Sequence, residues 1–375
     1  MDLQKLIELS REYGSNPDYV LGGGGNTSMK EGSRMYVKAS GYSLGDITEE
    51  GFVGVDLEAL NKIWVTGYPD DPDERESRVL ADLMDSRVPE DRDKRPSVET
   101  LMHALIPETY VVHTHPALIN GVTCAQNGAE TVKELFPGEA AWVPLVNPGY
   151  ILANEVRKVT QEFKETTGKF PRLIFLQNHG VVVGSREPDE VRRLNDSVVR
   201  RIRGRVDREP DFAPVDYKRD AVSEWEKTIL EYFKSQGEER TVIFTVNREV
   251  KNYVKDEESA APVMSAFSPD HIVYAGHEPL YVGKPAVPQF KDRMESYREK
   301  NGHFPKVILV EDLGVFAAGK NTKTAGLARD LFLDAVKIAV YADSFGGYRF
   351  MSEDQIAFIR NWEVERYRSN ISEKE

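Results

Sequence analysis

The stretch that decides the fold is VVHTHPAL, residues 111–118, in which two histidines lie one residue apart among β-branched residues. The run predicts a strand, and on a strand the side chains at i and i+2 point to the same face. His113 and His115 are therefore expected to converge. The chain has only seven histidines, and a pair at this spacing favours a metal site over one core and one surface residue.

A second apolar segment, PRLIFLQNHGVVVG, covers residues 171–184. It predicts two strands with a break at residues 178–180. His179 lies at this break, and Gly180 lets the chain turn sharply after it. A catalytic zinc commonly takes three protein ligands and leaves one position open. The predicted ligands are therefore His113, His115 and His179.

The segment PSVETLMHALI, residues 96–106, predicts a helix that precedes the histidine strand. Ser97 is expected at its N-cap and Glu99 in its first turn. A carboxylate beside a metal can ligate it or act as a general base. His103 shares the helix face of Glu99 and is expected behind the site or in the core.

The glycine run LGGGGNTSMK, residues 21–30, lacks the dinucleotide-binding spacing and is not followed by the Lys-Ser/Thr of a phosphate-binding loop. It can still hold an anion through backbone N–H groups and Asn26. Ser40 and Gly41, in the sequence VKASG, and Ser97 are further donors, and Lys38 adds positive charge. Together these places favour a phosphorylated substrate.

The second half of the chain contains a degenerate repeat of the first. GKFPRLIFLQNHG at residues 168–180 aligns without gaps with GHFPKVILVEDLG at residues 302–314. His179 then corresponds to Leu313. The segment that begins at His271 is a looser counterpart of the histidine strand, with Tyr274 and Gly276 at the ligand positions. We therefore expect a catalytic unit over residues 1–205, a linker and helix over residues 206–240, and a second copy without metal ligands over residues 241–375.

Composition limits the remaining classes. The chain has 375 residues, a net charge of −13 and one cysteine, Cys124, so neither a nucleic-acid partner nor a thiolate zinc site is expected. Residues 1–14 predict an amphipathic helix, and no apolar run reaches the length of a membrane span. A cytoplasmic protein without a membrane partner is the prediction. Residues 69–96 are charged and are expected to be irregular, and residues 192–208 predict a solvated, arginine-rich helix.

Five motifs, GGGNTS, ASG, PSVE, HTHP and QNHG, occur in this order. Residues 5–205 thereby resemble the class II aldolase/adducin family, in particular its L-fuculose- and L-rhamnulose-1-phosphate aldolases. The remainder is similar to the extension of bifunctional enzymes that join such an aldolase to a short-chain dehydrogenase, and the printed sequence ends before the dehydrogenase. The resemblance implies an α/β/α sandwich with a central, mostly antiparallel sheet, and usually a tetramer.

The resemblance also implies residue roles. Zn²⁺ would be held by the three histidines, and Glu99 would act as acid and base. The phosphate would be held by the following residues: Gly25, Asn26, Ser40, Gly41 and Ser97. The sequence departs from the fuculose-type pattern at Val98, where a second hydroxyl is usual, and this leaves the substrate open.

The sequence thus predicts a zinc-dependent aldolase that cleaves a ketose 1-phosphate to dihydroxyacetone phosphate and a short aldehyde such as lactaldehyde. A pentulose-5-phosphate 4-epimerase and a decarboxylase of a phosphorylated keto acid are alternatives on the same scaffold. An adducin-like interaction module without catalysis is a third alternative, disfavoured because all three histidines are present. A second metal site at His271, His277 and His303 is not expected, since their spacings fit no strand or helix face.

Overall fold

The structure is a computed structural model that describes residues 2–283 and 287–362. The chain forms two compact units, the first built mainly from residues up to 205 and the second mainly from residues 206–361. Within the described residues, no helix combines the length and the apolar character that a membrane crossing requires.

The first unit is built on a seven-stranded sheet with the order β3-β2-β1-β4-β7-β6-β5. Neighbouring strands are antiparallel except for β5 and β6, which are parallel. The strands are β1 (Asn26–Glu31), β2 (Arg34–Lys38), β3 (Phe52–Asp56), β4 (Tyr110–Thr114), β5 (Ala140–Val143), β6 (Leu173–Leu176) and β7 (Gly180–Ser185). The histidine strand β4 is therefore central, and all five of its residues are buried.

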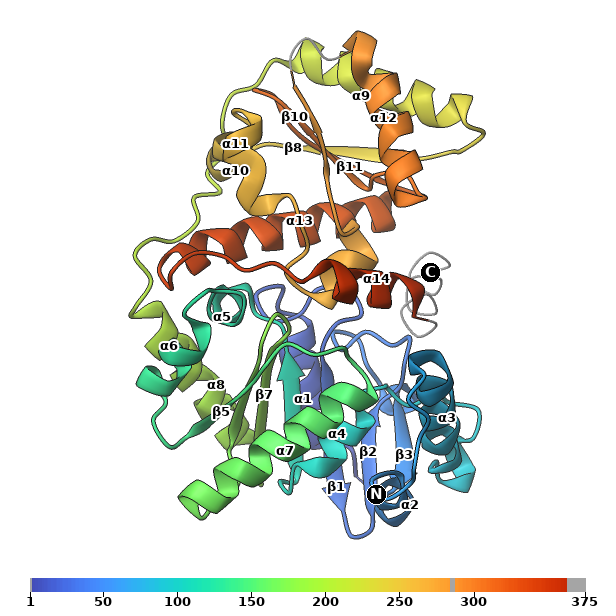
Figure 1. Ribbon diagram of the computed structural model, residues 1–375, viewed down its shortest axis with the longest axis vertical. Coiled ribbons are helices and arrows are strands. Elements are labelled where there is room, and N and C mark those ends of the chain that lie inside the picture. Colours follow the sequence, from blue (N-terminus) through green and yellow to red (C-terminus); the bar gives the residue numbers. More distant parts are fainter. Residues whose placement is uncertain (1, 284–286, 363–375) are drawn as a thin grey trace. The chain divides into compact units, whose positions relative to one another are not determined.

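Helices cover both faces of this sheet (Figure 1). One face packs Val111, Ile174 and Val182 against α4 and α7, whereas α1, α5 and α8 contact β1, β4 and β7 from the other side. The helices are α1 (Gln4–Gly14), α2 (Leu57–Ile63), α3 (Pro72–Asp85), α4 (Thr100–Leu105), α5 (Ala117–Thr123), α6 (Gly128–Leu135), α7 (Tyr150–Thr167) and α8 (Pro188–Arg203). The predicted α/β/α sandwich with a mostly antiparallel sheet is confirmed.

Two local predictions in the first unit were wrong. The charged stretch from residue 69 to residue 96 contains the 14-residue helix α3. Its start follows ordinary rules, because the Asp71 side chain accepts a hydrogen bond of 2.9 Å from the Glu74 N–H and Pro72 occupies the first helical position. The helix before the histidine strand begins later than expected, with Glu99 rather than Ser97 at its N-cap position.

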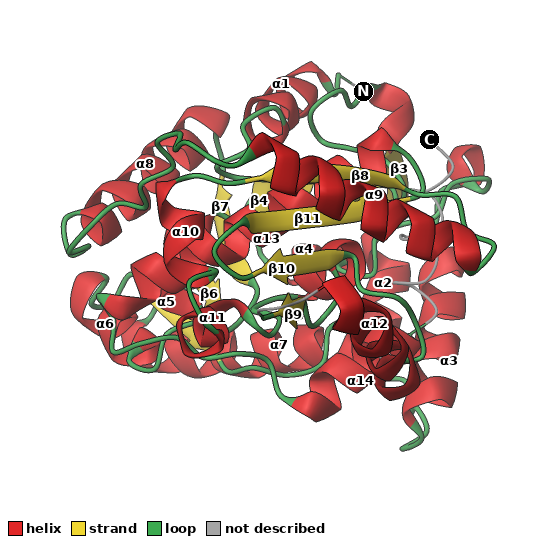
Figure 2. Cartoon of the chain, turned by 90° about the horizontal axis from the view of Figure 1, so that it is seen from above, coloured by secondary structure: helices red, strands yellow, loops and turns green. Residues whose placement is uncertain are grey.

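The second unit has a four-stranded sheet with the order β8-β11-β10-β9. One face packs on α9 and α12 through Ile308, Val310 and Phe316, and α13 contacts β8 and β11 from the opposite face (Figure 2). The strands are β8 (Thr241–Thr245), β9 (Leu280–Val282), β10 (Val307–Val310) and β11 (Gly314–Gly319); the helices are α9 (Arg219–Ser235), α10 (Arg248–Tyr253), α11 (Glu257–Ala260), α12 (Val287–Asn301), α13 (Thr322–Asp343) and α14 (Glu353–Asn361).

The two sheets share one topology. In the first unit, β6 and β7 form an antiparallel hairpin; β7 also pairs antiparallel with β4, and β6 pairs parallel with β5. In the second unit, β10 and β11 form the hairpin; β11 pairs antiparallel with β8, and β10 pairs parallel with β9. Val182 pairs with His113 in the first unit, and the equivalent Phe316 pairs with Phe244 in the second. The second, aldolase-like copy is therefore confirmed, but the strand that matches the histidine strand is β8.

The predicted counterpart at His271 was wrong. Residues His271–Ala275 form a buried π-helix and not a strand. The positions equivalent to His113 and His115 are Phe244 and Val246, because Thr245 occupies the place of Thr114 in the register. A sequence match through short apolar runs cannot distinguish a buried strand from a buried helical turn.

Candidate metal centre

The three predicted histidines converge in the first unit. His113 lies in β4, His115 follows the end of that strand, and His179 lies in the turn between β6 and β7. The Nε2 atom of His113 is 2.9 Å from that of His115 and 3.4 Å from that of His179. Among the described residues, these three make up the one group of potential ligands whose donor atoms all lie within 4.8 Å of one another.

This spacing fits a single metal ion. Zinc binds imidazole nitrogen at about 2.0–2.1 Å in a tetrahedral arrangement, which places two ligand nitrogens about 3.3 Å apart. The His113–His179 distance of 3.4 Å agrees with that value. Three imidazole nitrogens that face one another also bring their lone pairs together, and a cation between them removes the repulsion. The chemistry of the donor set therefore fits zinc.

His113 has the tautomer that metal binding requires. Its side chain is fully buried, and Nδ1 lies 3.0 Å from the backbone oxygen of Val181. Because a carbonyl oxygen only accepts, Nδ1 carries the proton and donates it. In the neutral form that binds a metal, the Nε2 atom is left with its lone pair directed at the centre, as in metal-ligating histidines whose other nitrogen binds a carbonyl.

The turn that carries His179 depends on its two neighbours. Asn178 has a φ of 53°, in the left-handed region, and its N–H donates to the Thr123 oxygen at 3.1 Å. A Cβ atom at Gly180 would lie only 2.3 Å from the backbone oxygen of Thr114. Glycine therefore lets β7 begin directly against the end of β4, and this close approach brings His179 to the other two histidines.

Asn120 supports the same turn and was not singled out in the sequence. Its Nδ2 atom donates to the His179 backbone oxygen at 3.3 Å, and its Oδ1 atom accepts from the Thr123 hydroxyl at 2.8 Å. The sequence signal that could have found Asn120 is an asparagine within the mostly apolar segment that directly follows the HTHP motif. In the structure this segment is helix α5, and Asn120 is fully buried on it.

Glu99 joins the histidines from the N-cap position of α4. Its Oε1 atom is 3.3 Å from Nε2 of both His113 and His179. Burial alone would raise the pKa of Glu99, but the charge and hydrogen bonds of His113 and His179 outweigh burial and hold that pKa well below its ordinary value. The carboxylate is thus ionised. Its other oxygen, Oε2, accepts a hydrogen bond from the Asn26 side chain.

The loops expected to hold an anion lie beside Glu99 in the same unit. Gly25, with a φ of 68°, directly precedes Asn26, which pairs with His113 across the β1–β4 ladder. The Lys38 ammonium group donates to the backbone oxygens of Gly23 at 3.0 Å and Tyr42 at 2.9 Å. Lys38 therefore connects the glycine loop to the turn that contains Ser40 and Gly41.

The turn that contains Ser40 and Gly41 is also connected to the segment before Glu99. Ala39 forms a bridge with Pro96, and the Ser40 hydroxyl donates to the Pro96 oxygen at 3.3 Å. Ser97 does not cap the helix as expected. Its Oγ atom accepts a hydrogen bond of 3.2 Å from the Glu99 N–H, so it fixes the backbone of the carboxylate residue.

Comparison with known proteins identifies the family. The class II aldolase and adducin N-terminal domain matches residues 4–203, and the second domain of class II aldolases matches residues 219–368. The chain belongs to the class II aldolase and adducin family. The first match covers the whole of the histidine and glutamate cluster.

The chain is similar to several curated proteins. An uncharacterized oxidoreductase of Bacillus subtilis, YuxG, is 25% identical over 428 residues, and the match covers 100% of this chain but 59% of that protein. The L-fuculose phosphate aldolase of Methanocaldococcus jannaschii is 36% identical over 58 residues, which cover 16% of this chain and 32% of that protein. The chain thus spans less than two thirds of the length of these curated relatives.

Among solved structures, the chain is similar to the N-terminal class II aldolase domain of a conserved protein from Thermoplasma acidophilum. The sequence identity is 29%, the TM-score is 0.46, and the match covers 54% of this chain and 93% of that one.

The second class II aldolase unit has histidines of its own, but they are arranged differently. The His277 and His303 rings are 5.6 Å apart, and burial lowers the pKa of His277 to about 4. His271 lies 2.8 Å from the Ser268 hydroxyl and 3.4 Å from a carboxylate oxygen of Asp334. Among the described residues, these contacts involve one or two histidines at a time and do not gather three ligands at one point.

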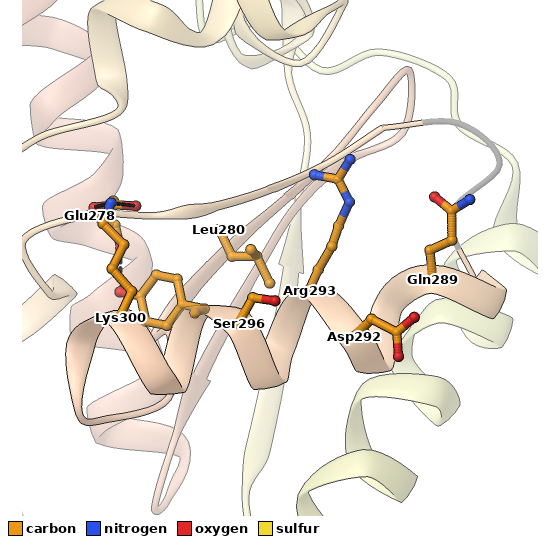
Figure 3. A pocket seen from close by; sticks show the side chains of 8 residues that line it. Glu278, Leu280, Gln289, Asp292, Arg293, Ser296 and Lys300 are labelled. Atoms are coloured by element: carbon orange, nitrogen blue, oxygen red, sulfur yellow. Dashed lines mark hydrogen bonds and ion pairs between the residues drawn. The ribbon is translucent and has the colours of Figure 1, made fainter.

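The second unit also has a cavity of about 570 Å³ against β9 and α12 (Figure 3). Three of its charged side chains are engaged within the protein, since Lys300 pairs with Glu278 at 2.7 Å and Arg293 donates to the Tyr281 oxygen at 3.1 Å. The lining residues are Glu278, Leu280, Gln289, Asp292, Arg293, Ser296, Tyr297 and Lys300. This set contains neither histidine nor cysteine, so the cavity lacks the ligand chemistry of the first unit.

Proposed function

We propose that the first unit is a zinc-dependent aldolase that cleaves a ketose 1-phosphate to dihydroxyacetone phosphate and a short aldehyde such as lactaldehyde. The observation that carries the proposal is the position of Glu99 Oε1, 3.3 Å from Nε2 of both His113 and His179. A buried, ionised carboxylate and a three-nitrogen metal site thus occupy one point. This combination suits proton transfer next to a polarised carbonyl group.

Zinc held by His113, His115 and His179 would act as a Lewis acid on the substrate carbonyl, the task that a lysine Schiff base performs in other aldolases. Cleavage breaks the bond between C3 and C4. The electron pair stays on C3, conjugated with the C2 carbonyl, and the ionised Glu99 carboxylate takes up the proton of the C4 hydroxyl as the aldehyde forms. Glu99 then donates a proton to C3, and in the direction of synthesis its carboxylate removes that proton.

The phosphate group would be bound next to this carboxylate. The proposed donors are the backbone N–H groups of Gly25 and Gly41 together with the side chains of Asn26, Ser40 and Ser97. The Lys38 contacts with Gly23 and Tyr42 support this, because they place a buried positive charge between the two loops. Opposite charge and clustered N–H groups are what an oxyanion requires.

We further propose that the protein works in the cytoplasm as a homo-oligomer, with a tetramer as the first expectation from the family resemblance. The second unit has Phe244, Val246 and Leu313 where the first has its histidines. It is therefore proposed to serve packing or assembly and not metal chemistry.

The test is proton NMR of dihydroxyacetone phosphate in D₂O with zinc-loaded protein. The aldolase is expected to exchange one C3 proton, and Glu99→Gln is expected to remove most of this exchange while zinc content stays at one ion per chain. This half-reaction does not require knowledge of the aldehyde. Zinc-replete protein without exchange would contradict the proposal and direct the search to pentulose 5-phosphates and phosphorylated keto acids. Protein that binds no zinc would favour an adducin-like interaction module.

A further inference from the structure

Strand β1 and helix α4 are connected by two hydrogen bonds between side chains far apart in the sequence. Asn26 Nδ2 donates to Glu99 Oε2, and Ser28 Oγ lies 2.8 Å from His103 Nδ1. Asn26 and Ser28 are two residues apart on the strand, and Glu99 and His103 are four residues apart on the helix. Each pair therefore shares one face of its element. The two contacts form a ladder that fixes the helix against the strand.

The two oxygens of Glu99 consequently have different surroundings. Oε2 is bound by the Asn26 amide, and Oε1 faces His113 and His179. The terminal torsion of a glutamate side chain has a broad energy profile and does not hold the carboxylate plane by itself. The Ser97 hydroxyl fixes only the Glu99 backbone. Asn26 is therefore the contact that sets which oxygen faces the histidines.

Asn26 is well placed to do this. Its side chain is 6% exposed, and its backbone pairs with His113 on β4. The orientation of the amide follows from chemistry, because the opposite orientation would place the amide oxygen against an ionised carboxylate. The Oδ1 atom is buried without a hydrogen-bond partner among the described residues, so the Nδ2–Glu99 bond is what holds the side chain.

We infer that Asn26 is a positioning residue for Glu99: by holding Oε2, it aims Oε1 at the carbon that exchanges its proton. The inference rests on the proposed function and deepens it. It differs from a role in phosphate binding, which acts on substrate affinity. The amide has two N–H groups, so both roles are chemically compatible. Positioning lowers kcat and acts through Glu99, whereas loss of a phosphate donor raises KM.

The experiment is a double-mutant cycle on dihydroxyacetone phosphate exchange with Asn26→Leu, which keeps the size of the side chain and removes the donor. We expect kcat to fall roughly 10- to 100-fold, a part of the usual contribution of general acid–base catalysis. The KM should rise as well, because the substitution also removes a proposed phosphate donor, but the rise in KM should not depend on Glu99. In the Glu99→Ala background, adding Asn26→Leu should lower the residual kcat less than threefold. Equal losses in both backgrounds would overturn the inference.

Thr27→Val is the matched control. Thr27 is the next residue on β1, is fully buried, and points to the other face, where its hydroxyl lies 2.7 Å from that of Ser10. The substitution keeps the shape of the side chain and should leave kcat unchanged. A kcat loss equal to that of Asn26→Leu would show a general effect of damage to β1 and would contradict positioning. If Asn26→Leu does not fold, Asn26→Ala takes its place in the same cycle.

Cobalt titration of zinc-free protein gives a readout without turnover. Asn26→Leu releases the Glu99 carboxylate beside the histidines, so the visible spectrum and affinity of bound Co²⁺ should change in the wild-type background and stay constant in the Glu99→Ala background. Identical changes in both backgrounds would refute coupling through Glu99. If the wild type exchanges no proton but the cobalt cycle shows coupling, the proposed function fails and the contact itself is upheld.

Discussion

Replacing Gly180 with alanine tests whether the close approach of β7 to β4 assembles the histidine site. The new Cβ atom would lie 2.3 Å from the Thr114 oxygen and 2.8 Å from Cδ2 of His115. Both neighbours are parts of the site, and the first is backbone that cannot rotate away. Reaching a tolerable separation of 3.0 Å requires a shift of about 0.7 Å. Zinc sites tolerate distance errors of only about 0.2 Å.

We therefore expect Gly180→Ala to raise the dissociation constant of zinc roughly 10- to 100-fold, or about 1.4–2.7 kcal/mol. The free energy of unfolding of the zinc-free protein should fall by about 1–3 kcal/mol, the usual effect of overpacking. Competition with a chromophoric chelator measures the first quantity, and urea unfolding measures the second. Zinc affinity equal to that of the wild type would refute the reasoning.

Gly314→Ala in the second unit is the matched control. Gly314 stands where Gly180 stands in the repeat, and its Cβ atom would lie 2.7 Å from Cε2 of Phe244 and 2.9 Å from the Thr245 oxygen. The steric problem is of the same kind, but no histidine is involved. Stability should fall while zinc affinity stays constant. Equal loss of zinc in both variants would show that general destabilisation, and not the local geometry, controls metal binding.

Two further predictions concern single histidines. Burial lowers the pKa of His103 to about 3, below its unfolded value near 6.5, so the unfolded state binds more protons between these values and stability is lost as pH falls through this window. The test is urea unfolding of the zinc-free protein at several pH values. His103→Gln should make the free energy of unfolding fall less steeply with falling pH, by up to about 1.4 kcal/mol per pH unit. An unchanged pH dependence of the free energy of unfolding would contradict a neutral His103. Replacing His277 or His303 with alanine should leave zinc content unchanged by elemental analysis, and a drop would reveal a ligand role that their 5.6 Å ring contact does not suggest.

The sequence predicts the site better than its surroundings. The alternation of His113 and His115 on a strand is a local rule, and the break at His179 was marked by a following glycine, so the triad was predictable from spacing alone. Asn120 was not predictable in this way, because its contact with the His179 backbone joins α5 to a turn 59 residues later. The same is true of the bond between Asn26 and Glu99, which are 73 residues apart.

The helix α3 shows a different kind of error. Its residues carry many charges and few apolar positions, and this composition suggested an irregular segment. Only Glu76, Val79 and Leu83 are buried, which is a narrow stripe. The capping aspartate followed by proline at the first position was the better signal, because it acts on the local backbone and does not depend on how much apolar surface the helix buries.

The repeat separates the residues that build the fold from those that carry the chemistry. Asn178 and Asp312 occupy the same turn with φ values of 53° and 57°, and a glycine follows in both copies. At the places of the three proposed ligands the second unit has Phe244, Val246 and Leu313, and Phe244 packs against Phe316 with ring centroids 4.9 Å apart. The strained turn and the glycine are thus retained in a copy that lacks the three histidines. They are requirements of a hairpin that packs against a neighbouring strand, and only the histidines that the turn presents distinguish the unit proposed to be catalytic.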